Sequence, residues 1–148
     1  MILGFTGTQK GSTPMQSRTF LSIIKQVNID EFHHGDCLGC DDEMDDLILQ
    51  QGTFRVTHPP INEIKRAFCH KKVHSTLTTA CRVLPAKDYI PRNHDIVNVS
   101  DWMIAMPHEY QEQRRSGTWA TIRYAKKIKK PLTIIFPDGS RIISFHGQ

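Results

Sequence analysis

Two segments of the chain, one of them glycine-rich, carry residue types that bind anionic groups. The first follows a short apolar run and offers four candidate contacts, Thr6, Gly7, Thr8 and Gln9. The second, residues 115–121, combines a glycine with three hydroxyl side chains at the predicted start of a helix. Backbone amides and the dipole at a helix start stabilise a phosphate, so we expect a phosphate site there. Capping of the helix by Ser116, and a simple tight turn in the first segment, are the structural alternatives.

Acidic side chains characterise a third segment, residues 33–41. The carboxylates of Asp36 and Asp41 would repel a phosphate, but they can accept hydrogen bonds from ribose hydroxyls, as acidic residues do in dinucleotide-binding folds. Capping of the following helix explains Asp41 equally well. The segment therefore predicts contacts to the sugar of a nucleotide and leaves a purely structural role open.

The four cysteines do not form a recognisable metal-binding pattern. Cys37 and Cys40 lie near two histidines, but Cys69 and Cys81 do not repeat their spacing, as a zinc ribbon requires. In a chain of 148 residues without a secretory signal, the thiols are expected to stay reduced. The sequence predicts no metal and no resident cofactor.

Charge is distributed unevenly along the chain, although the net charge is only +4. Residues 28–52 hold eight acidic and no basic residues, whereas residues 53–148 hold 16 basic and seven acidic ones. A positive surface attracts anions, which suits an anionic small molecule or a nucleic acid, with a merely solvated surface as the alternative. No apolar run approaches the roughly 20 residues of a membrane-spanning helix. The composition predicts a globular cytoplasmic protein with no membrane partner.

Short apolar runs alternate with amphipathic stretches throughout the chain. Strands are expected at 1–6, 31–34, 53–57, 102–106 and 132–136, with 141–145 as a further edge strand. Helices are expected at 14–27, 40–51, 91–99 and 117–129, with a short one near 63–71. Continuous apolar strands alternating with helices indicate an α/β fold, a mostly parallel sheet of about five strands with helices on both faces. We predict one domain spanning 1–148, in which residues 61–89 form an irregular insertion or a lid.

Ligands of open α/β sheets bind beyond the carboxyl ends of the strands. This rule selects four segments, residues 6–11, 33–41, 58–62 and 107–121 with the neighbouring Arg92, as the surroundings of a pocket.

Three motifs, in this order, resemble the SLOG superfamily. They are HGDCLGCD at 34–41, PRNHDIV at 91–97 leading into SDWMI at 100–104, and RSGTWATIRYA at 115–125. The superfamily includes the DNA-processing protein A family, which binds single-stranded DNA, and the lonely-guy phosphoribohydrolases. Other members sense nucleotide-derived signals in bacterial immunity. The similarity covers nearly the whole chain except residues 61–89.

The resemblance implies a Rossmann-like sheet with a nucleotide pocket built from these loops. It matches Arg92 to the arginine that precedes the fourth strand, and residues 116–121 to the phosphate-binding glycine turn. It also makes a homo-oligomer the expected state. The predicted ligand contacts are Thr6, Gly7, Thr8, Gln9, His34, Gly35, Asp36, Asp41, Pro60, Arg92, Asn93, Arg115, Ser116, Gly117, Thr118 and Thr121.

One position departs from the phosphoribohydrolase pattern. Those enzymes carry a catalytic glutamate three residues after the Gly-Thr pair of the turn, and this chain has Thr121 there. Without that carboxylate the group that assists glycosidic cleavage is missing. The sequence therefore favours a binding protein over an enzyme and leaves the activity open.

The leading hypothesis is a pocket for a nucleotide-derived small molecule, such as a cyclic nucleotide or an ADP-ribose derivative. Small proteins of this kind occur in phage genomes, so its specific form is a phage protein that sequesters an immune signal in the cytoplasm of the bacterial host. The first alternative is a hydrolase or transferase acting on an N-glycosidic bond, with Asp36, Asp41 or Glu109 as the carboxylate. Single-stranded DNA binding through the basic residues of 53–148 ranks below both.

Overall fold

A seven-stranded sheet forms the centre of the computed structural model, which describes residues 1–74 and 80–144. The strand order is β4-β3-β2-β1-β5-β6-β7, with β1 to β6 parallel and β7 antiparallel to β6. The strands are β1 (Ile2–Gly7), β2 (Glu31–His34), β3 (Phe54–Thr57), β4 (Cys81–Val83), β5 (Trp102–Met106), β6 (Leu132–Ile135) and β7 (Arg141–Ser144). The predicted α/β fold with a mostly parallel sheet is confirmed.

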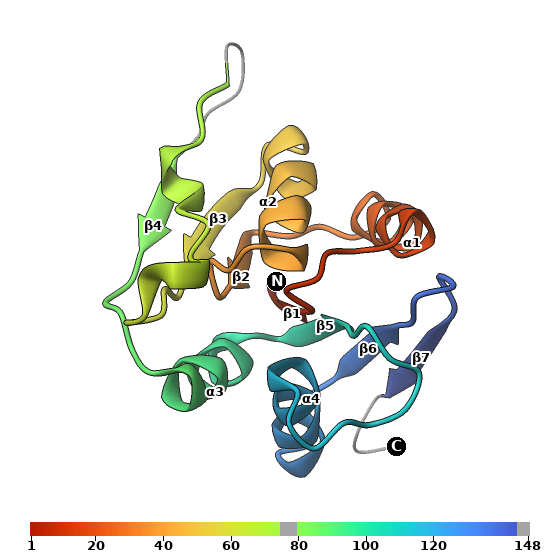
Figure 1. Ribbon diagram of the computed structural model, residues 1–148. Helices are drawn as coiled ribbons and strands as arrows, with labels where there is room; N and C mark the ends of the chain where they lie inside the picture. The colour runs from red at the N-terminus through yellow and green to blue at the C-terminus, as the bar shows by residue number, and fades with distance from the viewer. Residues whose placement is uncertain (75–79, 145–148) are drawn as a thin grey trace.

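Two helices cover each face of the sheet, as Figure 1 shows. They are α1 (Pro14–Ile24) and α2 (Cys40–Gln50) on one face, and α3 (Tyr89–Val99) and α4 (Gly117–Lys127) on the other. Alternate residues of the central strands feed two apolar cores, so that Ile104 packs under α1 and α2 while Met103 and Ala105 pack under α3 and α4. None of the helices in the described parts of the chain is long and apolar enough to cross a membrane.

The start of α1 is fixed by its sequence. The side chain of Thr13 accepts a hydrogen bond from the Gln16 amide at 3.1 Å, and the Gln16 side chain accepts one from the Thr13 amide at 3.0 Å. Buried Gln16 also donates through Nε2 to the carbonyl oxygens of Pro107 and Ile135, at 2.9 and 3.0 Å. One amide side chain therefore ties the β1–α1 loop to the carboxyl ends of β5 and β6.

The structure differs from the expected elements at the sheet edges and after β3. The sheet has seven strands rather than about five, because β4 and β7 extend it on both sides. Strand β7 confirms the edge strand expected at 141–145, of which Phe145 lies outside the described residues. The helix expected near 63–71 is instead two short 3-10 helices, η1 (Glu63–Lys65) and η2 (Cys69–Lys71), because Phe68 between them has a φ of 55°, which a right-handed helix does not accommodate.

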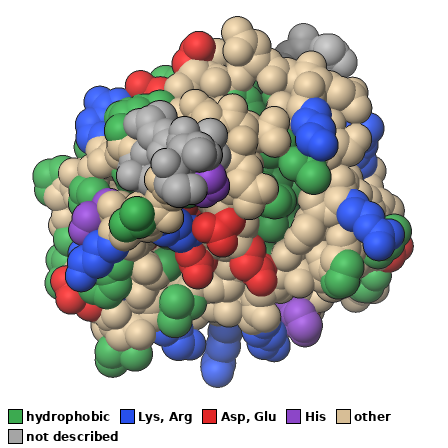
Figure 2. Space-filling view, turned by 90° about the horizontal axis from the view of Figure 1, so that it is seen from above, with side chains coloured by type: hydrophobic (Ala, Val, Ile, Leu, Met, Phe, Trp, Pro, Cys, Tyr) green, Lys and Arg blue, Asp and Glu red, His purple; other side chains and the backbone are tan. Residues whose placement is uncertain are grey.

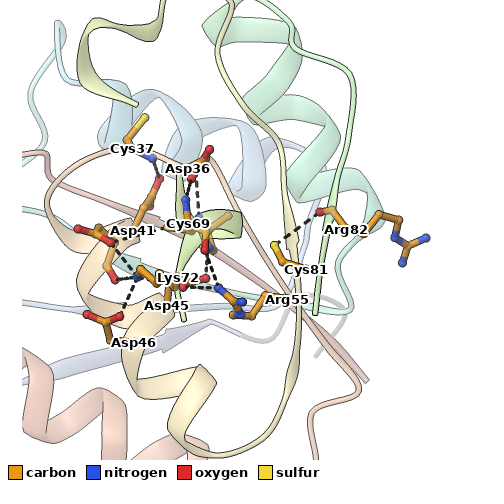
Figure 3. Close-up of polar contacts among 12 residues, drawn as sticks. Asp36, Cys37, Asp41, Asp45, Asp46, Arg55, Cys69, Lys72, Cys81 and Arg82 are labelled. Atoms are coloured by element: carbon orange, nitrogen blue, oxygen red, sulfur yellow. Dashed lines mark hydrogen bonds and ion pairs between the residues drawn. The ribbon is translucent and has the colours of Figure 1, made fainter. Parts of the chain in front are cut away.

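A buried carboxylate joins α2 to the strands beside it (Figure 3). Asp45 Oδ1 accepts a hydrogen bond from His34 Nε2 at 2.8 Å, and Asp45 Oδ2 lies 2.7 Å from Arg55 Nη1 and 3.0 Å from Lys72 Nζ. The Asp36 amide donates to His34 Nδ1 at 3.0 Å, so the ring is neutral with its proton on Nε2. Burial alone would raise the pKa of Asp45, but the hydrogen bond from His34 and the charges of Lys72 and Arg55 lower it to about 2.

Replacing this carboxylate is expected to destabilise the fold. Asp45→Ala removes the buried carboxylate that pairs with Arg55 and Lys72 and accepts from His34, which should cost about 3–5 kcal/mol of unfolding free energy. Asp46→Ala serves as the matched control, because it removes another carboxylate that contacts Lys72 but is 54% exposed, and it should cost less than about 1 kcal/mol. Urea denaturation measures both values, and equal midpoints for the two variants would contradict the prediction.

Candidate ligand-binding site

A cavity of about 720 Å³ opens at the carboxyl ends of the central strands. Its walls come from the loops after β1, β2 and β5, from the segment after β3, and from α3 and α4. Its position is the one at which open α/β sheets bind ligands, and its size is that of a small-molecule site. The predicted contacts that line it are Thr6, Gly7, Thr8, Gln9, Gly35, Asp41, Arg92, Asn93, Ser116, Gly117 and Thr118.

Five other predicted contacts do not line this cavity. Buried His34 and Asp36 are held by partners within the protein. Pro60 is buried in a bridge to Lys87 behind the wall. The Arg115 side chain is exposed, and the Thr121 hydroxyl donates to the Gly117 carbonyl of its own helix at 3.0 Å.

The start of α4 presents unpaired backbone donors to the cavity. The Ser116 hydroxyl accepts from the Trp119 amide at 3.2 Å, so Ser116 is the helix cap. The amides of Gly117 and Thr118 have no acceptor within the described part of the chain. A Cβ built on Gly117 would meet no atom within 4 Å, so the space over this helix start is open. The arrangement suits an anionic group.

The β1–α1 loop is held in place by hydrogen bonds at its centre. The Thr8 amide donates to the Met106 carbonyl at 3.0 Å, and the Thr8 carbonyl accepts from the Cys40 amide at 3.1 Å. The β1–α1 loop can lie this close to the start of α2 only because Gly39 has no side chain. A Cβ at Gly39 would lie 2.5 Å from the carbonyl oxygen of Gln9. These contacts place the lysine of this loop, Lys10, on the cavity wall.

Arg92 is a buried guanidinium in the wall, and it is anchored by backbone carbonyls. Its Nη1 donates to the carbonyl oxygens of Gly35 and His58, at 2.5 and 3.1 Å, and its Nε donates to Asn93 Oδ1 at 2.7 Å. Gly35 permits this approach, because a Cβ there would lie 2.4 Å from Arg92 Nη1. The Nη2 nitrogen has no oxygen acceptor within residues 1–74 and 80–144, and it donates to Cys37 Sγ at 3.9 Å.

Asp41 is a carboxyl group in the cavity wall that is only 6% exposed. Its Oδ2 accepts from the Cys37 amide at 3.2 Å, a contact drawn in Figure 3, while its Oδ1 has no donor among the described residues. Burial raises the pKa of Asp41, and the charge of Arg92 offsets this only in part. Burial also raises the pKa of the Cys37 thiol to about 11, so this side chain is a neutral thiol near pH 7.

The segment after β3 supplies wall residues that sequence reasoning missed. Asp36 holds it: its carboxylate accepts from Arg66 Nε at 2.8 Å and from the Cys69 amide at 2.9 Å, and its carbonyl accepts from the Ala67 amide at 2.8 Å. Because the segment is built of 3-10 turns, it has no apolar period that would have revealed its inner side. The cavity residues outside the predicted set are Phe5, Lys10, Cys37, Asn62, Ile64, Lys65, Tyr89, Ile96 and Glu109.

One group of side chains has the composition of a metal site. Possible ligand atoms of His34, Asp45 and Cys69 all lie within 4.8 Å of one another. Two cations, Arg55 and Lys72, already contact the carboxylate of Asp45, and burial raises the pKa of the Cys69 thiol. A metal ion would have to displace these cations and deprotonate the thiol, so the group is a hydrogen-bonded network of the fold.

Part of the positive charge of residues 53–148, four of the 16 basic residues, is used inside the protein. Arg55 and Arg92 are buried, and Arg66 and Lys72 form ion pairs with Asp36 and with aspartates of α2. On the face shown in Figure 2, acidic side chains gather near the middle and lysine and arginine side chains lie around the rim. These observations weaken the argument for a continuous phosphate-tracking surface.

A chain of hydrogen bonds runs behind Arg92. His33 Nε2 lies 2.7 Å from Glu31 Oε1, and His33 Nδ1 lies 2.8 Å from Nε2 of His58, whose carbonyl holds Arg92. Both rings are buried. Burial, together with the neighbouring His33, lowers the pKa of His58 to about 3.

Comparison with known proteins shows the fold. No protein-family model matches the sequence, and no curated protein matches it. The chain is similar in structure to the molybdenum cofactor binding protein of the phototrophic bacterium Rippkaea orientalis, with a TM-score of 0.66 and 16% identity over 91% of this chain and 76% of that one. It is also similar to the structural genomics target TM1055, with a TM-score of 0.58 and 15% identity over 88% of this chain and 71% of that one. At these identities the likeness shows a shared Rossmann-like fold.

Stability is expected to fall as the pH is lowered from 6.5 towards 3. In the unfolded chain His58 takes up a proton near its ordinary pKa of 6.5, whereas in the folded protein its pKa is about 3. The unfolded state then binds more protons, so the contribution of neutral His58 is complete above pH 6.5 and is lost below it, at about 1.4 kcal/mol per unit of pKa difference.

Urea denaturation across this pH range measures the effect. His58→Gln, which does not titrate, should flatten the dependence of unfolding free energy on pH. His108→Gln replaces an exposed histidine and should keep the wild-type slope. An unchanged slope in His58→Gln would show that another group causes the loss of stability.

Proposed function

We propose that the protein binds a nucleotide-derived small molecule, with a phosphate at the start of α4 and the rest of the ligand along the cavity. The observation that carries this proposal is the pair of unpaired amides, Gly117 and Thr118, opening onto a cavity of about 720 Å³. Helix starts of this kind bind phosphate through backbone donors and the helix dipole.

Two lysines of the cavity wall support an anionic ligand. Lys10 and Lys65 both line the cavity, and neither forms an ion pair within the described part of the chain. Flexible lysines at the rim of a site act as point charges for phosphate, while the fixed amides set its position. The cavity thus combines the mobile charges of two lysines with the fixed backbone donors at the start of α4.

The finer form of the proposal follows the sequence resemblance. Membership of the SLOG superfamily is supported by the three ordered motifs, two of which place Arg92 and Ser116–Thr118 in the same cavity wall. On this basis the ligand is a cyclic nucleotide or an ADP-ribose derivative. A phage protein that sequesters such a signal in the cytoplasm of its host, as a homo-oligomer, remains the specific hypothesis to be tested.

Binding is expected to depend on the phosphate and on the open space over Gly117. Calorimetric titration should show that guanosine and adenosine 5′-monophosphates bind at least about tenfold more tightly than their nucleosides, because the charged contacts to α4 are lost without phosphate. Gly117→Val fills the open space and should weaken nucleotide binding by about tenfold or more without lowering the unfolding midpoint, since its side chain meets no neighbouring atom at Cβ.

Arg115→Ala is the matched control, because this exposed side chain precedes the same helix but does not line the cavity. It should leave the affinity unchanged. Native mass spectrometry of the same samples reports the bound ligand and the oligomeric state. Equal affinity of nucleotides and nucleosides, or of wild type and Gly117→Val, would contradict the proposed phosphate site.

Cleavage of an N-glycosidic bond is a second candidate function, favoured by one observation. Asp41 and Glu109 both line the cavity, and burial raises the pKa of Asp41, as a general acid requires. Asp36, the third candidate carboxylate, is held by Arg66 and Cys69 outside the cavity. If a panel of nucleotides releases free base, and Glu109→Gln or Asp41→Asn abolishes the release, the protein is an enzyme; an intact panel leaves it a binding protein.

A further inference from the structure

The cavity has two chemically different ends, and the second one is defined by Asp41. At the α4 end the amides of Gly117 and Thr118 offer donors, and the carboxylate of Glu109 is engaged by Trp119 Nε1 at 3.1 Å. Asp41 offers an acceptor instead, because its Oδ1 has no protein donor among the described residues. A ligand donor that reaches Oδ1 forms a hydrogen bond to a charged acceptor that the described protein residues leave open. A ligand that fills the cavity is therefore selected by the hydrogen-bond donors that it brings to Asp41.

The sheet order sets which part of a nucleotide reaches this carboxyl group. Helix α4 follows β5 and helix α2 follows β2, and these two strands flank β1 on opposite sides. Their ends are two strand spacings apart, about 10 Å. The sugar hydroxyls of a nucleoside monophosphate lie close to its phosphate, whereas the far edge of the base lies at the other end of the molecule. A phosphate at α4 therefore brings the base edge, rather than the sugar, to Asp41.

We infer that Asp41 recognises a heterocycle with an amino-lactam edge, of the kind found in guanine and in pterins. This inference rests on the proposed function and names its ligand class. Such an edge presents a ring N–H and an exocyclic amino group side by side, so it can supply two donors to one carboxylate, whereas adenine supplies a single amino donor at its pairing edge. The carbonyl next to the ring N–H of such an edge accepts a hydrogen bond from Arg92 Nη2. Cys37 lies beside both groups, because its sulfur contacts Arg92 Nη2 and its backbone amide donates to Asp41.

A carboxylate at this place in the cavity narrows the set of proposed ligands. A guanine-containing nucleotide, cyclic or linear, satisfies both ends of the cavity, whereas the adenine of an ADP-ribose derivative leaves part of the carboxylate unpaired. Burial of Asp41 strengthens the selection, because sites with buried polar groups discriminate strongly against analogues that lack the matching donor.

The experiment compares purine nucleotides that differ only at this edge. Wild-type protein should bind GMP about tenfold more tightly than IMP, which lacks the 2-amino group, and than AMP. Asp41→Asn replaces an acceptor by a donor, so it should weaken GMP by about tenfold and favour XMP, which carries a carbonyl in place of the amino group. Asp46→Asn removes one negative charge from the exposed side of the same helix and should change neither preference.

The outcomes separate this inference from the proposed function. Nucleotides that bind through their phosphate but without preference among GMP, IMP and AMP would overturn the amino-lactam edge and leave the phosphate site intact. No binding of any nucleotide would overturn both. A phosphorylated pterin that competes with GMP more strongly than IMP does would support recognition of an amino-lactam edge by Asp41. It would also identify a pterin as the heterocycle that carries this edge. The wild-type comparison remains decisive even if Asp41→Asn does not fold.

Discussion

The carboxylate of Asp45 is the point on which one side of the molecule depends. It is buried among His34 of β2, Arg55 of β3 and Lys72, so it links a helix, two strands and the segment that follows η2. Removing one partner of a buried ion pair is costly, because the remaining charge stays buried with less compensation. Through Lys72 the network also contacts the segment after β3, whose earlier residues form part of the cavity wall.

Asp36 extends this network to the cavity. Its amide orients His34, while its carboxylate and carbonyl hold the segment that carries Asn62, Ile64 and Lys65. The left-handed backbone at Asp36, with a φ of 56°, lets one residue turn its donor and acceptors towards different elements. Asp36, which the sequence predicts as a ligand contact, thus lies outside the cavity lining and positions the cavity wall.

The sequence allowed the layers of the fold, the order of the main elements and most of the cavity to be predicted, because these follow from local patterns. A few neighbouring residues are enough to predict each buried strand, the cap at Thr13 and the glycine turn before α4. The features that could not be predicted depend on contacts between distant parts of the chain. The carboxylate of Asp36 is occupied by hydrogen bonds from residues 30 or more positions away, whereas Asp41 keeps one oxygen without a donor among the described residues. Local sequence patterns do not distinguish these two cases. Strand β4 was not predicted for a similar reason. It is three residues long, too short to show an alternating pattern, and it is a strand because it pairs with β3.

The position of β1 has a consequence for synthesis of the chain. This strand is made first, but one of its edges pairs with β5, almost a hundred residues later in the sequence. At about 5–20 residues per second, a ribosome needs several seconds to deliver that partner. Throughout this interval the half-sheet β1–β2–β3 carries an open, apolar edge, the kind of surface that pairs with other nascent chains. The yield of native protein should therefore be more sensitive to translation speed and chaperone supply than the stability of the finished fold suggests.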